Sequence, residues 1–567
     1  MAGLATSFGS GAMTNSMDDV AEQAKTIFII GSNTTEQHPV FGTRIRQAVL
    51  RRGVKLIVAD PRRIDITEFA IPQYGGLHLR HRSGTDVPLI NGLMYIILEK
   101  GWEDRKFIDD RTEGFDEFRE TIAQYSPKIV AQITGVPEDQ LYQAAEILAL
   151  NRPMAVMWAM GITQHIVGVR NVMDLANLQM LLGNMGIPGG GVNPLRGQNN
   201  VQGACDMGGL PNVYPGYQAV TLEAAREKFE AAWGVSLPDN VGMTVTEMVP
   251  AAGKSIKALY IMGENPMMSE PNLNHTRHQM EQLEFVVAQD LYINESGAFA
   301  DVFLPAVSWA EKDGTFTNTD RRVQRVRQAI APRGQARPDW QIICDLAKRL
   351  ETRLGRQRSA GWAYTHPSQV MAEIGTVYPD CAGITYERIE PVGLQTPVWD
   401  AQHPGTPFLF SQSFPRGRGK FHPLEYQPSA EMPDEDYPLI LTTGRVLEHW
   451  HGGTLTRHSN LDDLYPEALV EVNPADAVRL NVADGQPVRV TSRRGSIVLR
   501  ARVTQKITPG VVFIPFFFRE AAANLLTNNV VDPQAKIPEY KACAVRVTLA
   551  DENELADPQA RQKRGRY

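Results

Sequence analysis

Short apolar runs and segments of helical periodicity alternate along the first part of the chain. Apolar runs at 26–31 and 55–60 predict two buried strands. Between them, residues 43–53 repeat apolar positions at helical spacing and end at a glycine, which predicts a helix that stops there. The three segments form a strand–helix–strand unit. The same criteria predict helices at 87–101 and 137–151 and a buried strand at 153–161.

The same order of elements recurs later in the chain. A strand is expected at 258–266, a helix at 277–285 and a second strand at 286–290. Both copies carry a Gly and an Asn after the first strand and an Asp at the end of the second, namely Gly31, Asn33 and Asp60, and then Gly263, Asn265 and Asp290. Ligands of α/β folds bind where parallel strands end, and an acidic residue there can bind a ribose or a base.

The repeat therefore favours two nucleotide-like ligands, or one ligand with two such ends. The alternative is that each Gly-Asn pair only makes a turn and each aspartate only caps a helix. Neither copy contains G-x-G-x-x-G, so the ordinary NAD fingerprint is absent.

The last part of the chain has the alternation typical of β-structure. Strands are expected at 437–445, 468–473, 487–504 and 510–518, with one short helix at 474–482, which predicts a barrel-like domain. The preceding stretch is rich in Pro, Gly and polar residues. Four domains are therefore expected: α/β domains at 1–200 and 201–350, an irregular connector at 351–435, and a β-barrel at 436–567.

The composition narrows the class of protein. Of 567 residues, 43% are hydrophobic and 21% charged, as in ordinary globular proteins. The net charge of −7 argues against nucleic acid as the main partner. No apolar run reaches the roughly 18 residues of a membrane span, and the first residues do not form a secretory signal. Four scattered cysteines, with no C-x-x-C pair, offer no zinc or iron–sulfur ligand set and favour a reducing cytoplasm.

One glycine- and asparagine-rich segment could bind a small ligand. Residues 186–217 hold a single arginine, Arg196, among uncharged neighbours. A guanidinium in such a setting suits bidentate binding of a small carboxylate. The alternative, which composition alone favours, is a structural arginine that binds loop carbonyls.

A basic loop at 443–459 gathers arginines and histidines, namely Arg445, His449, His451, Arg457 and His458. Their spacing is not that of a zinc site, so anion or phosphate binding is the better functional interpretation, and a solvated loop is the alternative. Lys541 is a possible phosphate contact, although lysines are usually exposed. There is no G-x-S-x-G motif and no Walker loop, so hydrolase and kinase chemistry have no support.

Several longer strings, in order from residue 2 to about 547, carry a family resemblance. They include AGLATSFGSGAMTNS, DPRRIDITEFA, LRGQNNVQGACDMG and ADVFLPAVSWAEKDGTFTNTDRRVQ. The chain resembles the molybdenum- or tungsten-containing formate dehydrogenases of the dimethyl-sulfoxide-reductase superfamily. LRGQNNVQGACDMG is the most specific string, and related nitrate reductases are not expected to share it intact.

The resemblance implies an α/β fold with two Rossmann-like αβα domains related by a pseudo-twofold axis, plus the C-terminal barrel. It implies two molybdopterin guanine dinucleotides, one held by Gly31, Asn33, Asp60 and Arg62, the other by Gly263, Asn265, Gln289 and Asp290. Gly161, Gln164 and Gln198 would approach the pterins, and Arg445, His449 and Lys541 would close over phosphates and pterin edges. Arg196 would orient the carboxylate of formate, whose oxidation to CO2 leaves two electrons on the metal.

The resemblance also implies parts that this sequence does not contain. The family carries an N-terminal [4Fe–4S] domain, and a Cys or selenocysteine that ligates the metal a few residues before the equivalent of Ala2. No metal ligand is therefore expected in the chain itself. One hypothesis is an artificially truncated selenoprotein, which an in-frame UGA codon in the upstream DNA would establish.

The expected partners are formate and electron-transfer subunits of iron–sulfur or diaphorase type, in the cytoplasm. Two alternatives stay open: a fragment that holds the cofactor without turnover, and a sister enzyme such as a nitrate reductase.

Overall fold

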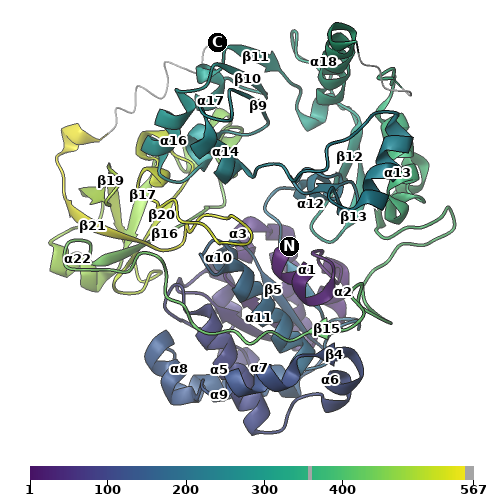
Figure 1. Ribbon diagram of the computed structural model, residues 1–567. Coiled ribbons are helices and arrows are strands. Elements are labelled where there is room, and N and C mark those ends of the chain that lie inside the picture. Colours follow the sequence, from purple (N-terminus) through teal and green to yellow (C-terminus); the bar gives the residue numbers. More distant parts are fainter. Residues whose placement is uncertain (356–360, 556–567) are drawn as a thin grey trace. The chain divides into compact units, whose positions relative to one another are not determined.

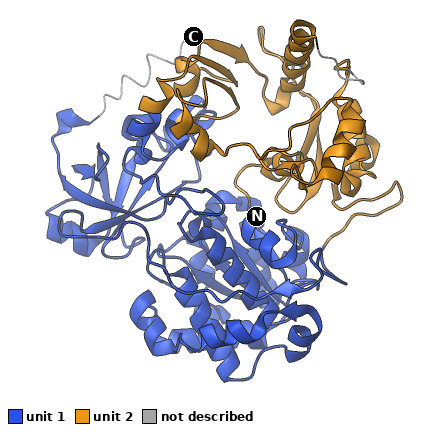
Figure 2. Cartoon of the chain, in the orientation of Figure 1, with its two compact units in different colours: residues 1–195, 267–277, 408–567 blue, residues 196–266, 278–407 orange. Residues whose placement is uncertain are grey.

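The computed structural model describes residues 1–355 and 361–555 as two compact units. The first unit comprises residues 1–195, 267–277 and 408–567, and the second comprises 196–266 and 278–407 (Figure 2). The chain therefore leaves the first unit twice before completing it. In the described part of the chain, no helix has both the length and the apolar character that a membrane span requires.

The first unit contains a five-stranded parallel sheet (Figure 1). Its order is β3 (Leu77–Leu79), β2 (Lys55–Ala59), β1 (Thr26–Ile30), β5 (Met154–Trp158) and β6 (Val192–Pro194). Along β1, Phe28 and Ile30 belong to one buried cluster, whereas Ile27 and Ile29 belong to another. Both faces are therefore covered, which explains why these strands are continuous apolar runs rather than alternating ones.

The helices of the first unit confirm the predicted strand–helix–strand pattern. The predicted helices at 43–53, 87–101 and 137–151 are α4 (Pro39–Arg52), α5 (Asp86–Glu99) and α9 (Glu138–Leu150). Gly53 ends α4 with a φ of 69°, a left-handed conformation that favours glycine. The other α-helices of residues 1–195 are α1 (Ala2–Phe8), α2 (Met17–Gln23), α3 (Thr34–Gln37), α6 (Arg105–Arg111), α7 (Phe115–Ile122), α8 (Pro127–Thr134), α10 (Met160–Thr163) and α11 (Gly168–Leu181).

The predicted β-domain is a closed barrel that belongs to the same unit. Its strands are β16 (Leu439–Gly444), β20 (Val511–Pro515), β17 (Leu469–Val472), β19 (Ser496–Val503), β18 (Pro487–Thr491) and β21 (Cys543–Leu549), in that order around the barrel. Leu441, Val490 and Val512 are fully buried in its core. The expected short helix is α22 (Pro474–Leu480), whose first turn is capped by the side chain of Asn473.

The second unit contains the strands of the second copy of the repeat, whereas most of its helix belongs to the first unit. The parallel sheet of the second unit has the order β11 (Val302–Pro305), β10 (Phe285–Asp290) and β9 (Ala258–Met262). The helix expected at 277–285 was placed wrongly: α16 is Leu273–Met280. The helix begins earlier, at Leu273, whose side chain is buried. Residues 281–284 form the turn that leads into β10.

The stretch expected to be an irregular connector holds ordered elements. Helices α19 (Pro367–Val377) and α20 (Tyr386–Ile389) lie there, and β14 (Leu394–Gln395) pairs with β13 (Arg322–Val326), which also pairs with β12 (Gly314–Thr317). Met371 and Ile389 are buried in one cluster with Val323. Proline and glycine in the flanks obscured this helical spacing. Other helices of the unit include α12 (Val201–Asp206), α13 (Glu223–Trp233), α14 (Val245–Ala251) and α18 (Asp339–Leu354).

Candidate cofactor-binding site

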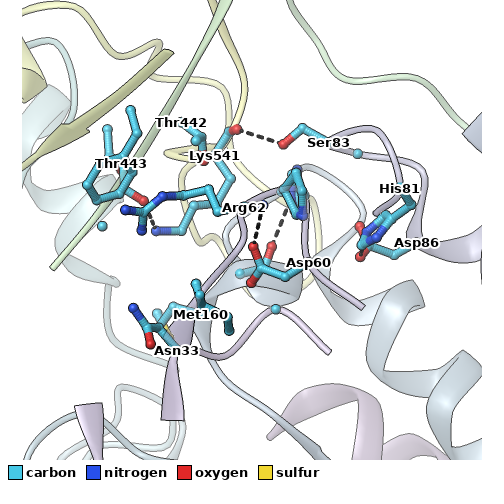
Figure 3. Close-up of a pocket in the computed structure, with 18 of the residues that line it drawn as sticks. Asn33, Asp60, Arg62, His81, Ser83, Asp86, Met160, Thr442, Thr443 and Lys541 are labelled. Carbon is cyan, nitrogen blue, oxygen red and sulfur yellow. Dashed lines mark hydrogen bonds and ion pairs between the residues drawn. The ribbon is translucent and has the colours of Figure 1, made fainter. Parts of the chain in front are cut away.

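A pocket opens in the first unit where the strands of the parallel sheet end (Figure 3). Its walls are the segments that follow β1, β2, β3 and β5, together with the end of β16 and the segment before β21. The lining includes Gly31, Asn33, Gln37, Asp60, Arg62, His81, Ser83, Asp86, Met160, Gly161, His165, Thr442, Thr443, Arg445, Phe513 and Lys541. This is the position at which α/β sheets bind ligands, and it brings together seven residues named from the sequence.

Two glycines allow the segments after β1 and β5 to touch. The amide of Gly161 donates a hydrogen bond of 3.0 Å to the carbonyl oxygen of Gly31. A Cβ on Gly161 would lie 2.4 Å from that oxygen, and Gly31 has a φ of +56°. Larger residues at either position would push the two segments apart. The glycines therefore bring two stretches of backbone to the pocket wall at once.

Asp60 and Arg62 follow β2 but face different partners. The carboxylate of Asp60 accepts a hydrogen bond of 2.9 Å from the backbone amide of Arg62, and burial raises the pKa of this aspartate. The guanidinium of Arg62 donates to both carboxylate oxygens of Glu471 at 2.9 Å and lies 3.6 Å from the ring centre of Phe513. Arg62 therefore ties the sheet to the barrel, and its charge is already matched by a carboxylate.

Two buried cations at the pocket, Arg445 and Lys541, form no salt bridge with a described residue. Lys541 is buried, and its ammonium donates 2.6 Å to the carbonyl oxygen of Thr443. Burial lowers the pKa of Lys541 to about 7. Burial also lowers the pKa of Arg445 to about 10, and its Nη1 is buried without a hydrogen-bond partner among the described residues.

Asn33 offers a buried acceptor in the same state, because its Oδ1 has no donor among the described residues. Buried polar atoms without partners are costly, and cationic donors are satisfied best by a carboxylate or phosphate. The chemistry of this donor set therefore fits an anionic ligand that also presents hydrogen-bond donors. A nucleotide diphosphate has both.

Residues that the sequence analysis missed form a buried acid–histidine pair on the same wall. Nε2 of His81 lies 3.1 Å from Oδ1 of Asp86. Burial opposes protonation of His81, but the hydrogen bond to Asp86 and the negative charges of Asp86 and Asp60 together raise the pKa of the imidazole. His165 lines the same pocket, with Nδ1 3.5 Å from Oε1 of Glu539. The segment after the third strand could have indicated His81 and Asp86, because strand ends share one edge of the sheet.

Two predicted cofactor contacts in the first unit are not among the residues that line the pocket. Nδ1 of His449 lies 3.1 Å from the hydroxyl of Thr456, and Nε2 lies 2.7 Å from the carbonyl oxygen of Tyr465. Its ring packs on Phe517, so His449 holds the basic loop in shape. Gln164 ends the short helix α10 and is half-buried.

No group of three or more His, Cys, Asp or Glu side chains is arranged to hold a metal ion within residues 1–355 and 361–555.

The second set of predicted residues lies at the ends of β9 and β10 in the second unit. Gly263 has a φ of +63°. Asn265 donates 2.8 Å to Glu295 and accepts from the hydroxyl of Ser296. Gln289 donates to Asp339 at 2.8 Å, and Asp290 accepts from Asn294 at 2.8 Å. Burial raises the pKa of Asp290. These side chains have the positions that the repeat predicts, and they are hydrogen-bonded within their own unit.

Arg196 and Gln198 lie at the start of the second unit. The backbone amide of Arg196 donates 2.9 Å to the hydroxyl of Thr319, and its Nε donates 3.2 Å to Oε1 of Gln202. The side chain of Gln198 is exposed. Arg196 therefore contacts side chains rather than only loop carbonyls.

Comparison with known proteins places the chain in a family of cofactor-dependent enzymes. The family description Molybdopterin oxidoreductase matches residues 3–349, and Molydopterin dinucleotide binding domain matches residues 439–544, which correspond to the barrel. The chain belongs to the molybdopterin oxidoreductase family, as the resemblance predicted.

Two relatives and one solved structure agree with this assignment. The chain is 47% identical over 548 residues to the F420-dependent formate dehydrogenase subunit alpha of Methanocaldococcus jannaschii, covering 96% of this chain and 79% of that protein. It is 38% identical over 562 residues to formate dehydrogenase H of Escherichia coli, covering 97% and 76%. Acetylene hydratase from Pelobacter acetylenicus has the same fold, with a TM-score of 0.75, 19% identity, and coverage of 97% and 80%.

Proposed function

We propose that the chain is the body of a formate dehydrogenase, which oxidises formate to carbon dioxide, one proton and two electrons. The observation that supports this most strongly is the pocket of the first unit, where the buried Arg445 and Lys541 lie at the strand ends of the sheet and form no salt bridge with a described residue. Relatives at 38–47% identity bear the name formate dehydrogenase. The proposal thus includes both the molybdopterin cofactor of the family and formate as the substrate.

The residues of the pocket fit one molybdopterin guanine dinucleotide. In this proposal Arg445, Lys541 and Asn33 bind its phosphates and adjoining polar groups, and Asp60 binds a ribose or base. Gly31 and Gly161 let the backbone approach the cofactor, and Arg62 closes the wall through its ion pair with the barrel.

A second dinucleotide is proposed at the equivalent strand ends of the second unit. Gly263, Asn265, Gln289 and Asp290 would hold it, and Gln164 and Gln198 would approach the pterins. His449 is proposed to act through the basic loop that carries Arg445.

Arg196 is proposed to bind the substrate. A guanidinium donates two parallel hydrogen bonds to a carboxylate, which fixes both the position and the orientation of formate. When bound, the molybdenum or tungsten cofactor supplies the acceptor for the two electrons. Electron-transfer subunits would then carry these electrons away, as the word subunit in the names of the relatives suggests.

The experiment uses the protein in its native complex. Metal and pterin content are measured first, followed by formate-dependent reduction of a viologen dye and by nitrate reduction as the contrasting assay. Arg196→Lys keeps the charge but removes the bidentate geometry, so the KM for formate should rise at least about ten-fold. Nitrate reduction without formate oxidation would refute the proposal, and cofactor without either activity would indicate a chain that only holds the cofactor.

A further inference from the structure

Arg196 is joined to a chain of buried polar side chains within the second unit. Gln202 and Asp206 lie one turn apart on α12, so they share a face of that helix. Oε1 of Gln202 accepts from Nε of Arg196 at 3.2 Å, and Nε2 of Gln202 donates to Oδ1 of Asp206 at 2.6 Å. The hydroxyl of Tyr217 donates to the same oxygen at 3.0 Å.

The carboxylate at the end of this chain fixes which way the amide of Gln202 points. An ionised carboxylate only accepts hydrogen bonds, so it must face the amide nitrogen of Gln202. The amide oxygen is then turned toward the guanidinium. The reverse orientation would place two acceptors 2.6 Å apart and two donors in contact at the arginine.

Burial of Gln202 and Asp206 fixes the orientation of the Gln202 amide. Gln202 is 1% exposed and Asp206 is 5% exposed, so bulk water does not replace either partner. Burial raises the pKa of Asp206 to about 6, against the hydrogen bonds from Gln202 and Tyr217 and the charges of Arg196 and Arg321, and the carboxylate is therefore the main form at neutral pH. An unpaired acceptor in such a place would cost more than the bond contributes.

We propose that Gln202 and Asp206 are positioning residues that orient the guanidinium of Arg196 for the carboxylate of the substrate. The inference rests on the proposed function and deepens it, because it assigns the orientation of the substrate arginine to two residues behind it. Neither residue needs to touch formate. Their contribution is the angle at which Arg196 presents its donors.

Exchanging the amide of Gln202 and the carboxylate of Asp206 tests this hydrogen-bond relay from Asp206 through Gln202 to Arg196. Gln202→Leu removes the acceptor for Arg196, and the KM for formate should rise about ten-fold, with kcat changed less. Gln202→Glu places two carboxylates together and should also raise KM. The double variant Gln202→Glu/Asp206→Asn restores one donor facing one acceptor, so KM should return to within about three-fold of the parent. Val201→Ala, on the same helix, is the matched control and should leave KM unchanged.

Crystal structures of these variants give a readout that does not depend on turnover. The guanidinium of Arg196 should be displaced in Gln202→Leu and should return to its original place in the double variant. An unmoved guanidinium or an unchanged KM in Gln202→Leu would overturn the inference, as would a double variant no better than Gln202→Glu. If the native complex does not oxidise formate, the proposed function fails, and the position of Arg196 in the crystals alone decides whether the relay exists.

Discussion

Replacing Lys541 by methionine should raise the stability of the protein without cofactor. The same change should weaken binding of the cofactor. The ammonium of Lys541 is buried and donates a hydrogen bond to the carbonyl oxygen of Thr443. Burial lowers its pKa from 10.5 to about 7, which at about 1.4 kcal/mol per pKa unit corresponds to a penalty of about 5 kcal/mol for the charged form. Methionine has nearly the same length and carries no charge, so it removes this penalty.

The penalty has a defined pH dependence. The pKa of Lys541 is lower in the folded state than in the unfolded state, so between pH 7 and 10.5 the unfolded chain binds more protons than the folded chain. The free energy of unfolding therefore increases as the pH rises through that range. Below about pH 7 the penalty is fully present. Lys541→Met should therefore raise the Tm of cofactor-free protein most at pH 6–7 and least near pH 10.

Thermal unfolding of cofactor-free protein and the pterin content of purified protein measure the two effects. Lys506→Met is the control, because that lysine is half-exposed and should change neither quantity. We expect a Tm several degrees higher without cofactor and a clear loss of bound pterin. A variant that is less stable without cofactor, or one that keeps its full cofactor content, would refute the reasoning that Lys541 is kept for an anionic ligand.

Three further substitutions test other parts of the pocket. Gly161→Ala places a methyl group 2.4 Å from the facing carbonyl oxygen, so both Tm and pterin content should fall together, and an unchanged Tm would contradict the close packing. Arg62→Met leaves the buried carboxylate of Glu471 unpaired and should cost about 3 kcal/mol in chemical denaturation, which the added change Glu471→Leu should largely recover. His449→Phe removes two hydrogen bonds and should cost about 1–3 kcal/mol of stability, while folded protein at low temperature keeps its cofactor; early cofactor loss would show that His449 binds it directly.

The strands and their ends could be predicted from the sequence because they follow local rules. Buried parallel strands are short continuous apolar runs, and the residues after them meet at one edge of the sheet. This was enough to name Gly31, Asn33 and Asp60 and to expect the barrel. The secondary structure was predicted wrongly at α16 and α19. In both places the stretch with helical periodicity is short and lies next to proline or glycine.

The roles of individual side chains were harder to predict because they depend on distant partners. Arg62 is paired with Glu471, which is 409 residues further along the chain. The burial of Lys541 could not be read from its neighbours, since lysines are usually exposed. Composition marked His449 as a ligand candidate, but only the fold shows that both of its nitrogens are turned to the protein.

The first unit is discontinuous in the sequence, and this determines when its cofactor pocket can form during synthesis of the chain. One wall of its pocket comes from residues 31–165 and the other from residues 442–541, with the whole second unit inserted between them. All residues from Gly31 to Lys541 must have been synthesised before both walls exist. Insertion of the cofactor into a complete pocket therefore follows synthesis of the whole second unit and of most of the barrel.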